Sequence, residues 1–175
     1  PNLEYIGTTK GTATSCCLRT TLDTSQSIAA NHHIAELMTL ASAGLGNNLR
    51  IRSIGDGVRR NQIAHLGKLG YLRASQSLAK SSKQGTRGGA LTTYYTCFDP
   101  EVFDLIKARN PTTTDEKKVD GIDYAIMYNP FFADKVKNGE DWMLISLKEA
   151  PDLEQAFYNK DESVFIKLYN KYYKD

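Results

Sequence analysis

The stretch T-A-T-S-C-C-L-R-T-T-L-D, residues 12 to 23, joins a β-prone run to the start of a helix. The segment 13–21 is rich in Thr and also contains Cys and Leu, a composition typical of a buried or half-buried strand. The thiol of Cys16 could perform redox or nucleophilic chemistry, and the carboxylate of Asp23 could accept hydrogen bonds from a ligand hydroxyl. Two plainer roles stay open, because an interior Cys is usually a small apolar residue and an Asp before a helix is usually a cap.

The composition limits the classes of function. The 175 residues are 41% hydrophobic, enough for one substantial core, and we expect one domain over 1–175. The net charge of +2 is spread along the chain, so we expect no nucleic-acid partner. No apolar run approaches the roughly 20 residues that span a bilayer, so we expect no membrane partner. Three cysteines, two of them adjacent, do not make a secreted framework, and we expect a reducing, cytoplasmic setting.

The next segment, 27–43, has the apolar spacing of a helix. One stripe contains Ala30, Ile34, Leu37 and Ala41. Glu36 is its only formally charged residue, and a helix this poor in charge packs either in a core or at a subunit contact. His32 and His33 point in different directions on a helix, so we expect no metal site. Glycines at 44 and 46 are expected to close the helix.

Two Gly-containing loops are candidate ligand sites. The segment N-N-L-R-I-R-S-I-G-D-G-V-R-R, 47–60, carries four arginines and a single acid, Asp56. Such a loop suits an anion such as phosphate, although these residues by themselves slightly favour a solvated basic loop. The segment S-S-K-Q-G-T-R-G-G-A, 81–90, could bring backbone N–H groups close to a ligand, but it has neither a Walker motif nor a G-x-G-x-x-G fingerprint.

Strands and helices alternate along the chain. We predict further strands over 90–98, 124–128 and 142–146. We predict further helices over 63–78 and 100–109, from 130 onward, and over 152–158 and 162–173. This alternation favours a parallel α/β arrangement. Because the chain begins at Pro1 without a methionine and ends in what resembles an unfinished helix, we expect a piece of a longer protein.

A series of short motifs then carries a resemblance. They are S-C-x-L, L-D-x-x-x-S-I, A-G-L-G, R-I-R, S-x-x-Q-G-x-R-G-G-A and D-Y, in that order. In order and spacing the chain resembles the large, catalytic subunit of class I ribonucleotide reductase over 1–175. The resemblance implies an α/β fold that is about half of a ten-stranded barrel, and reduction of ribonucleotides to deoxyribonucleotides by thiyl-radical chemistry.

The resemblance also implies roles at the substrate. Cys16 corresponds to one of two reducing cysteines, whose oxidation to a disulfide supplies two electrons. Its partner and the radical cysteine are expected outside the chain. Ser15 and Gly44 correspond to substrate-binding positions, and Arg87 to a residue whose loop closes over the nucleotide. Cys17, the next residue along the strand, should face away and pack.

A second implied site binds an allosteric effector. Asp23, Arg52 and Arg59 correspond to the specificity site, where a deoxynucleoside triphosphate selects the base to be reduced. A carboxylate accepts from the sugar hydroxyl there, and arginines meet the triphosphate. Gln84 is the candidate for sensing the base. The helix at 27–43 corresponds to the homodimer contact.

Partners follow from the same resemblance. We expect no directly bound cofactor, but dNTP or ATP effectors with Mg²⁺, a metal-containing small subunit that supplies the radical, and thioredoxin or glutaredoxin as reductant. The chain should be inactive alone. Two alternatives stay open: a non-catalytic nucleotide-binding and dimerisation module, and one half of a split reductase completed by a second chain. Cys97 matches no functional position and is expected to be structural.

Overall fold

The computed structural model describes residues 7–9, 16–81 and 89–174, and its chain divides into two compact units. The first unit comprises Pro1–Ile51, Leu69–Tyr94 and Ile106–Ala125. The second comprises Arg52–Lys68, Tyr95–Leu105 and Ile126–Asp175. The boundaries between the units fall within two strands, β5 (Leu91–Thr96) and β6 (Asp123–Met127), so each strand has residues in both units.

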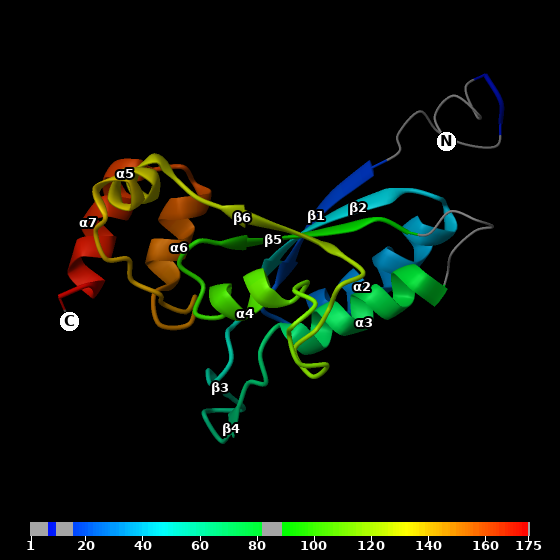
Figure 1. Ribbon diagram of the computed structural model, residues 1–175, viewed down its shortest axis with the longest axis horizontal. Coiled ribbons are helices and arrows are strands. Elements are labelled where there is room, and N and C mark those ends of the chain that lie inside the picture. The colour runs from blue at the N-terminus through cyan, green and yellow to red at the C-terminus, as the bar shows by residue number, and fades with distance from the viewer. Residues whose placement is uncertain (1–6, 10–15, 82–88, 175) are drawn as a thin grey trace. The chain divides into compact units, whose positions relative to one another are not determined.

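A four-stranded sheet has the order β1-β2-β5-β6 (Figure 1). Its strands are β1 (Cys16–Leu22), β2 (Gly44–Arg50), β5 (Leu91–Thr96) and β6 (Asp123–Met127). The pairing of β2 is parallel both with β1 and with β5. Parallel neighbours need a crossover, and α2 (Ser25–Leu40) connects β1 to β2. The predicted parallel α/β architecture is therefore confirmed.

The helix α2 begins earlier and ends earlier than the predicted 27–43. Its cap is Thr24, whose side chain accepts a hydrogen bond from the backbone N–H of Ser27 at 3.1 Å. After α2 the chain turns through Ser42, at φ 58°. The glycines at 44 and 46 do not close the helix, because parallel pairing with β1 draws 44–50 into β2. The predicted loop over 47–60 is wrong in its first four residues for the same reason.

The burial of α2 is the reverse of the usual pattern. Its buried positions are Asn31, Ala35 and Thr39, which are polar or small. Its large apolar side chains that are exposed are Ile34, Leu37 and Leu40, with Leu37 45% exposed. The stripe that periodicity predicts as a contact surface is therefore uncovered in this chain. The neighbouring helix α3 (Leu69–Ser81) starts six residues later than predicted, because Ile63 and Ala64 form a strand.

The second unit begins with a hairpin. Strands β3 (Gly57–Val58) and β4 (Ile63–Ala64) pair antiparallel inside the segment predicted to be an arginine loop and the start of a helix. The unit also contains the start of α4 (Val102–Lys107), together with α5 (Pro130–Asn138), α6 (Pro151–Tyr158) and α7 (Glu162–Tyr172). These helices confirm the predictions for the C-terminal part of the chain.

Aromatic packing holds the second unit together. Phe98, Phe165 and Tyr169 are buried, and the indole of Trp142 stacks on the Tyr169 ring with centroids 4.6 Å apart. The predicted strand over 142–146 is wrong, because these residues form no strand. The indole N–H donates to the Cys97 carbonyl, and Ile145 N–H to the Phe98 carbonyl. Trp142, Met143 and Ile145 of this irregular segment pack against the buried core.

Candidate active site and effector loop

Cys16 and Gly44 face each other across two neighbouring strands. They are the first residue pair in the parallel register of β1 and β2. The Cys16 side chain is exposed, and Gly44 has no side chain to cover it. Alternation along a strand turns Cys17 to the other face, where its Sγ lies 3.4 Å from the Met38 Sδ of α2. The expectation that Cys17 packs is confirmed, and Cys16 is left on the sheet face away from α2.

The same sheet face continues into a pocket. Its volume is about 500 Å³, and its lining includes Leu18, Thr20, Gly46, Asn48 and Tyr94. Leu18 follows Cys16 by two residues and shares its face, about 7 Å along the strand. A Cβ at Gly46 would lie 2.5 Å from the Leu18 side chain, so a larger residue there would crowd the floor of the pocket. Cys16 does not line this pocket, but it lies on the same face of β1, two residues before Leu18.

The three remaining candidates for substrate and base recognition are Ser15, Gln84 and Arg87. All three lie outside the residues that the structure describes. Their assigned roles stay predictions.

Asp23 follows β1 directly and is half-buried. The cap of α2 is Thr24, so capping does not account for Asp23. Asp23 belongs to the first unit, and Arg52 and Arg59 to the second. Each set is positioned within its own unit.

The two candidate effector arginines lie on the hairpin β3–β4 and just before it. The Arg52 Nη1 donates to the Gly57 carbonyl at 2.8 Å, which holds the guanidinium against the base of the hairpin. Arg59 is exposed at the tip with φ 48°, a left-handed value. Asp56 hydrogen bonds to neutral donors, accepting from Ser53 N–H at 2.7 Å and from Ser146 Oγ at 2.9 Å.

A buried ionic cluster closes the segment that carries these arginines. The Lys68 side chain is 1% exposed, and its Nζ lies 2.8 Å from Asp99 Oδ2 and 3.4 Å from Glu101 Oε2. Glu101 also accepts backbone N–H groups from Ile54 at 3.0 Å and Lys68 at 2.8 Å, near the two ends of the segment. Sequence reasoning missed this cluster, because neither a single Lys after Gly67 nor the segment D-P-E at 99–101 indicates a shared buried site.

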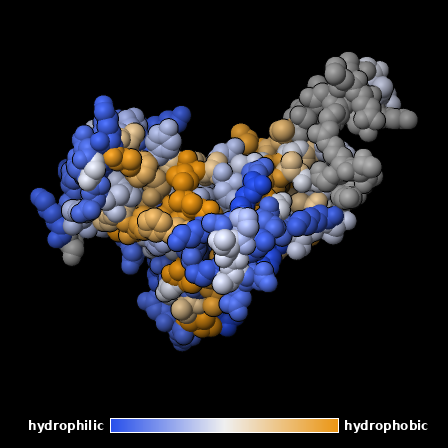
Figure 2. Space-filling model, in the orientation of Figure 1, coloured by the Kyte–Doolittle hydropathy of each residue, from blue (hydrophilic) through white to orange (hydrophobic). Residues whose placement is uncertain are grey.

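The hairpin also exposes apolar side chains (Figure 2). Ile54, Ile63 and Leu66 are all exposed, Leu66 by 90%. An apolar group beside exposed arginines is typical of a surface that another molecule covers.

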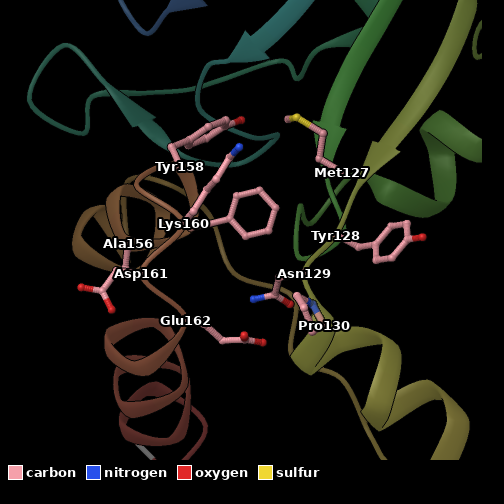
Figure 3. A pocket seen from close by; sticks show the side chains of 10 residues that line it. Met127, Tyr128, Asn129, Pro130, Ala156, Tyr158, Lys160, Asp161 and Glu162 are labelled. Carbon is pink, nitrogen blue, oxygen red and sulfur yellow. The ribbon is translucent and has the colours of Figure 1, made fainter.

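A separate pocket of about 480 Å³ lies in the second unit (Figure 3). Most of its polar side chains are engaged in structural contacts: Asn129 and Asp161 cap α5 and α7, and Glu162 accepts from Phe131 N–H. None of the predicted site residues lines it. We therefore do not assign it as the active site.

The remaining titratable groups give no second site. Cys97 is buried, and burial raises the pKa of its thiol to about 12, as expected of a structural cysteine. Among the described residues no three His, Cys, Asp or Glu side chains cluster as metal ligands would. No described helix combines the length and apolar character needed to span a bilayer.

The amino-acid sequence is similar to that of a known protein family. Residues 14–175 match the family model for the ribonucleotide reductase barrel domain. The chain is 32% identical to the ribonucleoside-diphosphate reductase subunit alpha of Buchnera aphidicola (subspecies Acyrthosiphon pisum) and 32% identical to subunit alpha of reductase 1 of Escherichia coli. Each match covers 100% of this chain and 23% of the relative. The subunit alpha of enterobacteria phage T4 is 30% identical over 76% of the chain and 18% of its own length. The chain thus belongs to the ribonucleotide reductase family and spans part of the barrel domain of a large subunit.

Proposed function

We propose that this chain supplies one reducing thiol and the effector-binding loop of a ribonucleotide reductase large subunit. The observation that carries the proposal is the position of Cys16, exposed opposite Gly44 on the sheet face away from α2. A reducing thiol must reach both substrate and partner thiol, and this face of β1 leaves it accessible. Cys17 lies beside it in sequence but is packed against Met38.

The proposed chemistry balances without a bound redox cofactor. The thiols of Cys16 and a partner cysteine outside the chain lose two protons and two electrons as their disulfide forms. The ribonucleotide accepts these reducing equivalents, and its 2′-hydroxyl leaves as water. The radical that starts the reaction comes from a metal-containing small subunit, and thioredoxin or glutaredoxin returns the disulfide to thiols. The three free cysteines fit a reducing cytoplasm.

We assign the substrate to the open face of β1 and β2. Gly44 lets the nucleotide approach the backbone beside Cys16, and the pocket beyond Leu18 gives room along the same face. Ser15 and Arg87 complete the proposed substrate contacts.

We assign the effector, a dNTP or ATP with Mg²⁺, to Asp23, Arg52 and Arg59. Arg59 lies on the hairpin β3–β4 and Arg52 just before it, and the acid between them, Asp56, accepts hydrogen bonds from Ser53 and Ser146. Guanidinium groups suit a triphosphate, and a carboxylate suits the sugar hydroxyl. Gln84 is the proposed sensor of the base.

We propose that α2 forms the homodimer contact. Ile34, Leu37 and Leu40 lie on one side of the helix and are exposed, which suits a covered interface better than solvent. Replacing Leu37 by Asp should shift the large subunit toward monomer in sedimentation velocity. The matched control is Gln26→Asp, because Gln26 is an exposed polar residue of the same helix. A dimer that survives Leu37→Asp unchanged contradicts the assignment.

Calorimetric titration of the complete large subunit with deoxynucleoside triphosphates tests the effector site. Asp23→Ala and Arg52→Gln should each weaken binding about tenfold or more, because each removes a hydrogen bond to or from a charged group. Lys137→Met is the control, since Lys137 is exposed on α5. Unchanged affinity in both variants rejects the site.

A second candidate function is a nucleotide-binding and dimerisation module without chemistry. One observation favours it. The hairpin that carries Arg59 consists of residues of the second unit, whereas Cys16 belongs to the first unit. Cys16→Ser separates the two functions. If the chain is part of a reductase, the substitution abolishes turnover of the complete subunit and leaves effector affinity unchanged. If the chain is only a module, the substitution changes neither the turnover of the complete subunit nor its effector affinity.

A further inference from the structure

We infer that Lys148 is a third phosphate-binding cation of the effector loop. The inference rests on the proposed effector site. Lys148 is an exposed residue in the turn before α6. Its Nζ donates to the Gly57 carbonyl at 3.1 Å and to Asn61 Oδ1 at 2.6 Å. It therefore reaches the hairpin that carries Arg59 from a segment about 90 residues further along the chain.

Lys148 and Arg52 share one acceptor. The Gly57 carbonyl that receives Lys148 Nζ also receives Arg52 Nη1 at 2.8 Å. Two positive groups on one neutral oxygen lie close to each other and repel. An anion bridging them relieves this repulsion and adds charge-assisted hydrogen bonds.

Within the part of the chain that the structure describes, Lys148 forms no ion pair that would supply this anion. The two groups that accept from its Nζ, the Gly57 carbonyl and the Asn61 side-chain oxygen, are both uncharged. The acid nearest in sequence to Gly57 is Asp56, whose carboxylate accepts from Ser53 N–H and Ser146 Oγ. The Ser146 bond also fixes the turn that carries Lys148 against the hairpin. The Lys148 ammonium is thus held in place with its charge unpaired.

The hairpin tip is ordered around this contact. Arg59, Arg60 and Asn61 have consecutive left-handed φ values of 48°, 58° and 65°. Side chains rarely adopt such conformations, and structures keep them where surrounding contacts hold them. The Lys148–Asn61 bond is one such contact. It ties the third left-handed residue to the cation and leaves Arg59 two positions away.

The ligand class follows from the number of cations. The three positive charges of Arg52, Arg59 and Lys148 balance the charge of an extended triphosphate chain better than that of a single phosphate. Lys148 would then favour nucleotides according to their phosphate count. Nothing in its contacts would distinguish the base.

Titration of the complete large subunit with deoxyadenosine tri-, di- and monophosphate tests this role. Lys148→Met should weaken triphosphate binding about tenfold and leave monophosphate binding within about twofold, as loss of one charge-assisted contact to the distal phosphates predicts. Lys148→Arg should retain most of the triphosphate affinity. Lys137→Met is the matched control of an exposed lysine in the same unit.

Each outcome has one meaning. An equal loss for all three nucleotides shows that Lys148 only braces the hairpin, and this overturns the inference. No loss for the triphosphate in Lys148→Met, alongside a loss in Arg52→Gln, overturns the inference and keeps the effector site. No loss in either variant rejects the effector site itself. Should Lys148→Met fail to fold, Lys148→Gln gives the same comparison with a polar side chain.

Discussion

Cys16 lies opposite Gly44 at the start of the parallel register between β1 and β2, and Cys17 packs against Met38 on the other face of the sheet. One strand therefore presents two adjacent thiols to two different environments. The arrangement separates a reactive cysteine from a packing cysteine by a single residue. Because strand side chains alternate, no rotation of either side chain exchanges the two roles.

The first prediction concerns thiol reactivity. Iodoacetamide at pH 8 should modify Cys16 first, because its side chain is exposed. Cys97 should react last, since it is buried and its pKa is raised to about 12, which keeps it protonated at that pH. Peptide mass spectrometry over a time course measures the order. Equal rates for Cys16 and Cys97 would contradict the described burial.

The second prediction is a loss of stability in alkali. Burial raises the Cys97 pKa from 9.0 to about 12, so the native state holds its proton more tightly than the unfolded state. The associated stability is present below pH 9 and is lost between pH 9 and 12, at about 1.4 kcal/mol per pH unit. Urea unfolding at pH 8.5 and pH 10 should show this loss in the wild type and not in Cys97→Ala. Burial also raises the Tyr95 pKa to about 12, but from 10.0, so its contribution falls away only at higher pH.

The third prediction compares two glycines with nearly the same backbone conformation. Gly67 and Gly55 have φ values of 88° and 86°. A Cβ at Gly67 would lie 2.4 Å from Glu101 Oε1, whereas a Cβ at Gly55 would meet no atom within 4 Å. Gly55→Ala should lower the free energy of unfolding by about 1–2 kcal/mol, the cost of the left-handed backbone.

Gly67→Ala should cost that amount and about 1–3 kcal/mol more, because Glu101 must move away from the N–H groups of Ile54 and Lys68. Chemical unfolding of both variants gives the comparison. Equal losses would show that Glu101 does not hold the arginine segment.

The fourth prediction is a stabilising substitution in the first unit. All three guanidinium nitrogens of Arg19 are buried without a hydrogen-bond partner among the described residues, and burial lowers the Arg19 pKa to about 10. Arg19→Met should raise the free energy of unfolding by about 1–3 kcal/mol, since it removes an unsatisfied buried cation. Arg109→Met is the control: Arg109 forms an exposed ion pair with Asp123, worth about 0–1 kcal/mol. Destabilisation by Arg19→Met would mean that Arg19 has a partner.

The sequence could predict the elements whose signals are local. β1, β5, β6 and the last three helices follow from strand composition, from Asn129 before Pro130, and from apolar periodicity. The end of α2 could not be predicted, because the glycines at 44 and 46 resemble a helix stop and instead pair with β1. Residues 142–146 resemble a strand in composition, but their backbone N–H groups bond to the aromatic core instead. Ile145 donates to the Phe98 carbonyl and Met143 to the Tyr169 hydroxyl, and both partners are distant in sequence.

For the candidate site, alternation along a strand was enough to separate Cys16 from Cys17. The exposure of the α2 stripe and the Lys68, Asp99 and Glu101 cluster were not predictable in this way. Both depend on contacts between segments distant in sequence, for which the local pattern carries no signal. The hydrogen bond from Arg52 to the Gly57 carbonyl was not predictable either, because it depends on the hairpin β3–β4, which the sequence did not indicate.

Ribonucleotide reduction by the complete large subunit, with its small subunit and reductant present, tests the central claim most directly. The comparison is Cys16→Ser against Cys17→Ser, two substitutions of the same kind one residue apart. We predict that Cys16→Ser abolishes repeated turnover while its effector affinity stays within about twofold, and that Cys17→Ser retains activity. Wild-type turnover in Cys16→Ser would contradict the account.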